Sequence, residues 1–459
     1  MRRLTTFTAG LELVYCRRLD PTPVREMSRL MGLWHRVARA RTREEMNTVY
    51  LYLEIVFYSF LGAAASFDGT YVVRLGATNR LIALQSSLPA LAAALAYIPA
   101  ARFLERRQSP FGWIVGSLTA VRLMYLFMVI WPMAAMPQAA PLVVATIVTM
   151  QLPAVVFATG WSPLLADVIP ERSRARVLSW RMMLMSGMVG LLTYGFGLWL
   201  ERAPFPQNYQ LMYGIAVVGG VISVTMLGRL KLPPTEADEA HHSQLEAQQA
   251  PVLSGAIELL RENRYFRSIL LNTVVFNSGF WLVMPLYTIL FIKQLGASDG
   301  WVGMRTMILQ AGGLLGYIIW RRVTERWGEG KTLLVALPLV TTFPFLLAAF
   351  PDLTIILVLS AWISITSPGV DLPHSMIFMS QLPRRRRHMA VALYSMAMNV
   401  AAFVMPIVGV QLSEMIGLVP TLLVGGAVRV VGAALFYLRP IKEDMSPRAL
   451  LRWGRARGD

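Results

Sequence analysis

Twelve long apolar segments constrain this chain more than any other feature of its sequence. Each is roughly 20 residues long, the length at which an α-helix crosses the hydrocarbon core of a bilayer. The segments are continuously apolar, whereas the strands of a membrane barrel alternate between apolar and polar residues. We therefore predict an all-α polytopic membrane protein. The predicted helices cover residues 48–67, 81–101, 111–134, 141–165, 177–200, 211–230, 269–292, 301–320, 333–350, 353–377, 390–410 and 418–438.

The composition agrees with a surface that faces lipid. Only 15% of the 459 residues are charged and the mean hydropathy is +0.52, whereas a soluble domain has about a quarter of its residues charged. Cys16 is the only cysteine, which excludes a disulfide framework and a thiolate metal cluster.

Basic residues are distributed unevenly between the two sets of loops. Fifteen lie in connections from an even-numbered to an odd-numbered helix, and four lie in the other connections. Positive charge stays in the cytoplasm, so we predict an inner-membrane protein with both termini cytoplasmic. The net charge of +17 lies in short loops, which argues against nucleic-acid binding. The fifteen are Arg102, Arg106, Arg107, Arg172, Arg174, Arg176, Arg181, Arg321, Arg322, Arg326, Lys331 and Arg384 to Arg387, and the four are Arg74, Arg80, Arg202 and Lys293.

The chain divides into five parts on this interpretation. A basic N-terminal segment (1–47) precedes a six-helix half (48–230), and a cytoplasmic linker (231–268) leads to a second six-helix half (269–438) and a basic tail (439–459). The linker begins with Pro233-Pro234 and ends in an amphipathic pattern over residues 256–267, which favours an interfacial helix.

The two halves share sequence at an offset of 220 residues. Leu75-Gly76-Ala77-Thr78 recurs as Leu295-Gly296-Ala297-Ser298, and Arg102, Glu105 and Arg106 recur as Arg322, Glu325 and Arg326. Because each half holds an even number of helices, the halves are parallel repeats related by an axis along the membrane normal.

The repeat, the topology and one loop motif together resemble the major facilitator superfamily of transporters. The motif lies between helices 2 and 3 as Glu105-Arg106-Arg107, and its second copy is Glu325-Arg326-Trp327-Gly328. Ala101 and Arg321 stand where the family has a leading glycine. The helix 4 and helix 5 signatures of proton antiporters are absent. Trp161, the run Asp167 to Pro170, and Arg172, Arg176 and Arg181 further resemble a bacterial branch of the superfamily, which implies no particular substrate.

The resemblance implies a secondary transporter of a small solute that works by alternating access. We find no nucleotide-binding loop, zinc-site spacing or nucleophile motif, so we expect neither an enzyme nor a cofactor, and transport driven by a gradient. Proton coupling and export both stay open. We expect a monomer. The alternative is a non-transporting receptor or accessory subunit with the same fold.

Glu54 is the main candidate for a substrate or proton site. A carboxylate inside helix 1 costs on the order of 3 kcal/mol on insertion scales, so it needs a cavity or a partner. In the superfamily, helices 1, 4, 7 and 10 line the central cavity, and the repeat position in helix 7 is Val274. Glu54 either binds a proton or substrate, or pairs with a nearby cation.

Other intramembrane polar residues have two interpretations each. Asp371 and His374 follow Ser367-Pro368-Gly369, which is expected to kink helix 10, and they either relay protons or form a structural pair. Arg122 and Arg429 lie mid-span in helices 3 and 12 and cannot be neutralised by deprotonation, which favours structural bracing. The uncharged candidates, for cavity lining or plain packing, are Gln151 and Trp161 in helix 4 and Asn272, Asn277 and Trp281 in helix 7.

Acidic and basic residues at the cytoplasmic ends of helices 2 and 8 suggest a gate. We expect Glu105 to pair within its own half, with Arg174 or Arg176, and to favour an outward-open state. The gate candidates are Glu105, Arg106, Arg174, Arg176, Glu325 and Arg326.

Overall fold

A computed structural model describes residues 42–107, 109–134, 136–232, 260–261, 263–381, 387–439 and 441. Within these ranges it contains helices and no strand, and twelve of the helical segments are long and apolar enough to cross a membrane. The prediction of twelve membrane helices is therefore confirmed.

The first half of the chain holds helices 1 to 6. They are α3 (Arg43–Ala65) with α4 (Asp68–Arg74), α5 (Asn79–Glu105), α6 (Pro110–Met124) with α7 (Leu126–Ala134), α8 (Ala139–Thr149) with α9 (Gln151–Val168), α10 (Glu171–Arg202) and α11 (Gln207–Gly228), with a 3-10 turn η1 (Met136–Gln138) before α8.

The second half holds helices 7 to 12. They are α14 (Arg264–Thr288) with a π-helical continuation η2 (Ile289–Gln294), α15 (Asp299–Trp327), α16 (Glu329–Ala349), α17 (Leu353–Thr366) with α18 (Pro368–Ser380), α19 (Arg387–Ile416) and α20 (Leu418–Leu438).

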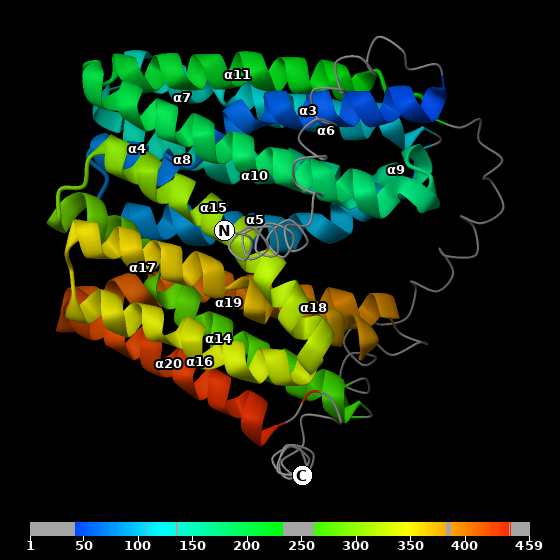
Figure 1. The fold of residues 1–459 in the computed structure, drawn as a ribbon. Coiled ribbons are helices and arrows are strands. Elements are labelled where there is room, and N and C mark those ends of the chain that lie inside the picture. The colour runs from blue at the N-terminus through cyan, green and yellow to red at the C-terminus, as the bar shows by residue number, and fades with distance from the viewer. Residues whose placement is uncertain are drawn as a thin grey trace, which may run out of the picture.

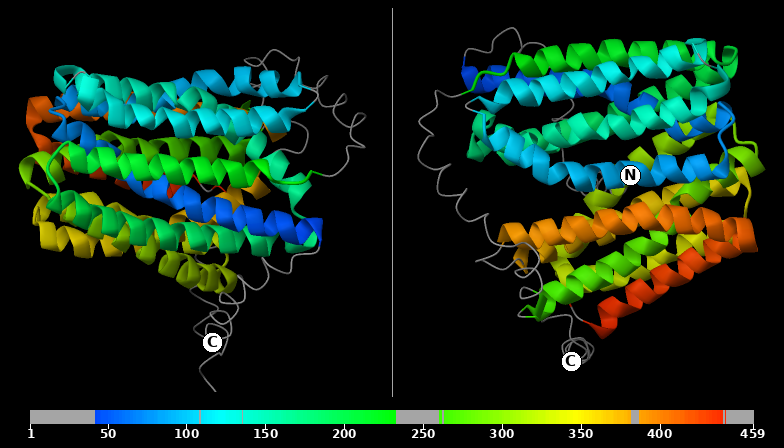
Figure 2. Two further views of the ribbon diagram at one scale, coloured as in Figure 1. Left: turned by 90° about the horizontal axis from the view of Figure 1, so that it is seen from above. Right: turned by 180° about the vertical axis from the view of Figure 1, so that it is seen from behind.

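The two halves lie side by side as two helical bundles, drawn one above the other in Figure 1. Two helix pairs make most of the contact between them: α10 packs on α15, and α5 packs on α19. Helix α15 slants across the boundary in Figure 1, and α5 lies beside α19 in the view from behind in Figure 2. We call the face where α11 ends and α14 begins the linker face, and the opposite face the distal face.

Helix 1 is longer than predicted at both ends. It begins at Arg43 because Thr42 and Glu45 form a capping box, in which each side chain accepts a hydrogen bond from the other residue's backbone N–H at 3.3 Å. It continues past Phe67 to Arg74 because Asp68, which marked the end of the apolar run, is satisfied by the Tyr213 hydroxyl at 2.8 Å. Phe67, the last residue of the predicted helix, is buried.

Proline accounts for two interruptions within membrane helices. The predicted kink in helix 10 is confirmed, since α17 ends at Thr366 and α18 begins at Pro368. Helix 4 breaks at Met150, three residues before Pro153, whose nitrogen cannot donate to the carbonyl of Thr149.

The repeated four-residue sequence forms the same turn in both halves. Gly76 and Gly296 have φ values of +86° and +64°, which glycine adopts without strain. Thr78 and Ser298 then cap the next helix by accepting hydrogen bonds from the backbone N–H groups of Leu81 and Trp301, at 3.3 and 3.1 Å. The repeat therefore encodes a glycine turn followed by an N-cap.

Orientation in the membrane stays a prediction that reporter fusions test. Fusions after Thr78, Ala203, Phe350 and Gly417, which lie at the distal face, are expected to report a periplasmic position, because the arginine-rich loops lie at the other face. Fusions after Arg107 and Gly328 are expected to report the cytoplasm. An inverted pattern at any one of these sites would contradict the assignment.

Candidate functional site

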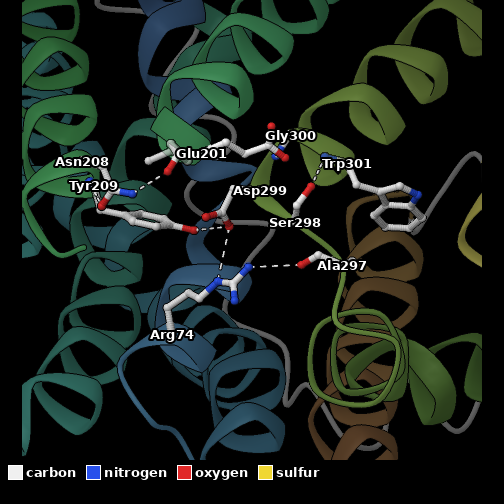
Figure 3. A network of polar contacts seen from close by, with 10 residues as sticks. Arg74, Glu201, Asn208, Tyr209, Ala297, Ser298, Asp299, Gly300 and Trp301 are labelled. Carbon is white, nitrogen blue, oxygen red and sulfur yellow. Dashed lines mark hydrogen bonds and ion pairs between the residues drawn. The ribbon is translucent and has the colours of Figure 1, made fainter. Parts of the chain in front are cut away.

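Two cations at the distal face each reach across from one half to the other. Arg74, at the end of α4, lies 3.6 Å from Oδ1 of Asp299 through its Nε and donates to the carbonyl of Ala297 at 3.1 Å (Figure 3). Lys293, in η2, donates to the carbonyl of Ala77 at 2.6 Å and to Oδ1 of Asn79 at 2.9 Å.

These contacts follow the internal repeat. Ala77 and Ala297 are equivalent at the offset of 220, and so are Asn79 and Asp299. Each half therefore presents the same two positions, a turn carbonyl and the first residue of the following helix, to a cation from the other half. We call the six residues Arg74, Ala77, Asn79, Lys293, Ala297 and Asp299 the distal clasp.

Other side chains of the first half fix the start of α15. Tyr209 donates its hydroxyl to Asp299 at 2.7 Å, and Asp299 is only 7% exposed. Glu201 accepts from the backbone N–H of Gly300 at 3.1 Å (Figure 3), where the helix dipole favours negative charge. Asn208 donates to the carbonyl of Leu200 at 2.7 Å and thereby ties the start of α11, which carries Tyr209, to the end of α10.

Next to the clasp, the backbones of α10 and α15 approach closely. A Cβ on Gly303 would lie 2.6 Å from the carbonyl oxygen of Thr193, and one on Gly197 would lie 2.8 Å from that of Asp299. Only glycine allows this approach, as at other helix crossings in membranes.

A cavity of about 400 Å³ adjoins the clasp at the distal face. Charged, polar and apolar groups from both halves line it: Arg74, Leu200, Glu201, Ala203, Phe205, Asn208, Ser298 and Asp299. An exposed ion pair between Arg80 and Glu414, at 3.5 Å, adds a further contact between the halves, at α5 and α19.

Glu54 has a cationic partner in the first half. Its carboxylate is 2% exposed, lies 2.7 Å from Nη2 of Arg181 and accepts from the Ser223 hydroxyl at 3.2 Å. The guanidinium of Arg181 also lies 4.6 Å from the ring centroid of Trp161. Counting Arg181 with the loop cations is wrong, although the predicted helix 177–200 contains it, because α10 carries it into the membrane-spanning region where these contacts partly bury it.

The remaining intramembrane candidates are dispersed. Arg122 and Arg429 lie over the rings of Tyr58 and Phe276 at 4.4 and 4.6 Å. His374 shares a hydrogen bond of 2.8 Å with the Thr273 hydroxyl rather than with Asp371, which is exposed. The structure therefore gives no direct pair between Asp371 and His374.

The uncharged candidates differ in their surroundings. Asn272 is fully buried and donates to the backbone carbonyls of Leu435 and Arg439 at 3.2 and 2.9 Å, so it anchors the end of α20 rather than lining a cavity. Half-buried positions are found for Gln151, Trp161, Asn277 and Trp281.

The proposed gate at the linker face is described in part. Glu325 pairs with Arg321 of its own helix at 2.9 Å, and both side chains are exposed. Arg174 donates to the carbonyl of Ile169 at 3.4 Å, while Arg106, Arg176 and Arg326 are exposed. The side chains of Glu105 and of residues 384–387 lie outside the described part, so the role of Glu105 stays a prediction. Most of the linker, residues 233–259 and 262, also lies outside it, so the interfacial helix stays a prediction too.

Sequence reasoning missed the residues that join the halves. Arg74 and Asp299 directly flank the two copies of the repeated turn, and this position was the available signal. Arg305 was missed too, although it lies inside the predicted segment 301–320.

Fold and site define a membrane protein of two six-helix halves whose described polar contacts with each other lie at the distal face. The family model of the Major Facilitator Superfamily matches residues 51–290 and 269–456. The chain belongs to the Major Facilitator Superfamily. A comparison with curated proteins gave no match.

Solved transporter structures share the fold. A D-xylose–proton symporter superposes with a TM-score of 0.62 at 13% identity, covering 87% of this chain and 98% of that one. A bacterial homologue of the human lysosomal transporter Spinster, in an inward-facing and occupied conformation, gives 0.61 at 13% identity, covering 86% and 96%. The nucleoside transporter NupG gives 0.60 at 14% identity, covering 87% and 100%.

Proposed function

We propose that this chain is a secondary transporter that moves a small solute by alternating access, and that the structure corresponds to the state closed at the distal face. The observation that supports this most strongly is the distal clasp, in which equivalent positions of the two repeats each bind a cation from the other half. Contacts of this kind have to break when the halves rock apart. A receptor or accessory subunit with the same fold would not need them to be reversible.

With the arginine-rich loops in the cytoplasm, the distal face is periplasmic and this state is inward-facing. The solute then exchanges with the cytoplasm in this state and with the periplasm once the clasp opens. Energy comes from an ion gradient or from the solute's own gradient.

Cross-linking across the distal face tests the proposal. In a Cys16→Ser background, Arg80→Cys and Glu414→Cys place one thiol in each half at an exposed contact. Bridging them with a short bifunctional thiol reagent is expected to stop transport, because the distal face can no longer open. Cleaving the bridge is expected to restore it.

The matched control puts both thiols in one half, as Arg80→Cys with Arg202→Cys, where the same reagent should leave transport unchanged. Full transport with the Arg80–Glu414 bridge in place would exclude opening at this face.

A further inference from the structure

Two arginines in the second half have no carboxylate at ion-pairing distance among the residues that the structure describes. Arg305, in α15, donates through Nε to the Ser360 hydroxyl at 3.0 Å. Arg429, in α20, is 6% exposed, and its buried Nε has no hydrogen-bond partner among the described residues. Both lie in membrane-spanning helices, where an arginine keeps its charge.

In the first half, by contrast, a buried carboxylate lies near the intramembrane arginines. Arg181 has the Glu54 carboxylate at 2.7 Å, and Arg122 lies within electrostatic range of the same carboxylate. In the second half, Asp371 is within electrostatic range of Arg429 but forms no ion pair with it, and its side chain stays exposed. One acid also leaves an excess of positive charge beside two arginines.

Aromatic rings hold both guanidinium groups. Arg305 lies 4.9 Å from the ring centroid of Phe291, and Arg429 lies 4.6 Å from that of Phe276 and 5.7 Å from that of Phe280. Such an aromatic support fixes the planar group and leaves its N–H edges available for bidentate binding of an oxyanion.

Tyr287 supplies a hydroxyl group on α14 between Phe280 and Phe291, the rings that lie near these two arginines. It lies within electrostatic range of both arginines, and its buried hydroxyl has no hydrogen-bond partner among the described residues. It also lies two residues before the π-helical turn η2 that carries Phe291, and π-helical turns occur frequently at functional sites.

We propose that Arg305 and Arg429 bind the carboxylate or phosphate groups of an anionic solute, with Tyr287 lying along α14 between their two aromatic supports, so that the transported substrate is an organic anion. This inference rests on the proposed transport function and adds the substrate class to it. The anion supplies the negative charge that the two arginines lack, and each guanidinium donates hydrogen bonds to the oxygens nearest to it.

Binding to the purified full-length protein, in detergent without anionic lipid, tests the inference. The probes are inorganic phosphate and three matched pairs: benzoate with benzamide, succinate with succinamide, and glucose 6-phosphate with glucose. Chloride keeps the ionic strength constant. We expect thermal stabilisation by one or more of the anions and not by its neutral partner. Arg305→Gln and Arg429→Gln should each weaken that binding about tenfold to hundredfold.

Three further variants separate a binding role from a structural one. Arg305→Lys should retain part of the affinity, Tyr287→Phe should lose less than either glutamine variant, and Arg229→Gln, an exposed arginine at the end of α11, should change nothing. The inference is wrong if no anion, phosphate included, raises the thermal stability of the parent protein more than that of the double variant with Arg305→Gln and Arg429→Gln. Stabilisation by added phosphatidylglycerol alone would assign the anion to lipid and also overturn it. Because no transport is measured, either failure leaves alternating access intact.

Discussion

Reversing the charge at position 74 is expected to open the distal face. Arg74→Asp places a second carboxylate beside Asp299, so the ion pair of the clasp becomes repulsive. Asp299 is nearly buried but Arg74 is 37% exposed, so the change falls between those for exposed and buried pairs, at roughly 2 kcal/mol. That shifts the equilibrium between the closed and open states about 30-fold.

Labelling of a buried clasp residue measures this shift. In a Cys16→Ser/Ala77→Cys background, position 77 is 4% exposed in the closed state. A membrane-impermeant maleimide applied from the distal side should label it faster in Arg74→Asp than in the parent, and the transport rate should fall. Adding Asp299→Arg should restore part of both.

The matched control is Arg80→Asp, which reverses the charge of an arginine that is 80% exposed and pairs at the rim. It should change labelling little, because exposed pairs contribute little. Equal labelling in Arg74→Asp and the parent would show that Arg74 does not hold the face closed.

Removing the Glu54 carboxylate is expected to give the largest loss of stability. Glu54→Ala leaves Arg181 partly buried without its anion, and breaking a buried pair in this way costs about 3–5 kcal/mol. The midpoint of thermal unfolding of the purified protein should therefore drop clearly. Ser223→Ala, which removes only a hydrogen bond to the same carboxylate, should cost about 1 kcal/mol. Equal effects of the two variants would contradict an energetic role for the ion pair.

A second substitution of Glu54 tests whether this residue couples transport to a proton gradient or only stabilises the fold. If a proton can displace Arg181 from the Glu54 carboxylate, proton binding would be coupled to movement of α10 against α3. Glu54→Gln should then abolish accumulation driven by a proton gradient, while solute exchange in proteoliposomes survives. If Glu54→Gln accumulates solute at the parent rate, Glu54 is a brace, and coupling has to be sought at Asp371 and His374.

The membrane helices were predictable because their signal is local. An apolar run of the right length has one stable solution in a bilayer, and the kink at Pro368 and the repeated turn follow from proline and glycine in the same way. The extended start of helix 1 was also readable, since Thr42 to Glu45 is a capping-box sequence.

The clasp was not predictable from the same kind of signal. The residues that contact each other in the clasp are more than 200 positions apart in the sequence. The two cations are not equivalent in the repeat, because Arg74 corresponds to Gln294 and Lys293 corresponds to Val73. Arg181 was misplaced for a related reason. A basic residue near a helix start looks like a loop residue until its buried carboxylate partner, 127 positions away, is known.

The glycine contact between α10 and α15 divides α15 into a short arm and a long arm, whose ends would travel different distances if the helix turned about it. Gly303 is near one end of α15, so by helical rise about 6 Å of helix lies between it and Asp299 and about 36 Å between it and Trp327. If the halves rotate about this contact as rigid bodies, the Trp327 end travels roughly six times as far as the Asp299 end. Parting the clasp by the few ångströms that break a hydrogen bond would then sweep the opposite end of α15 through a distance comparable to the width of a solute path.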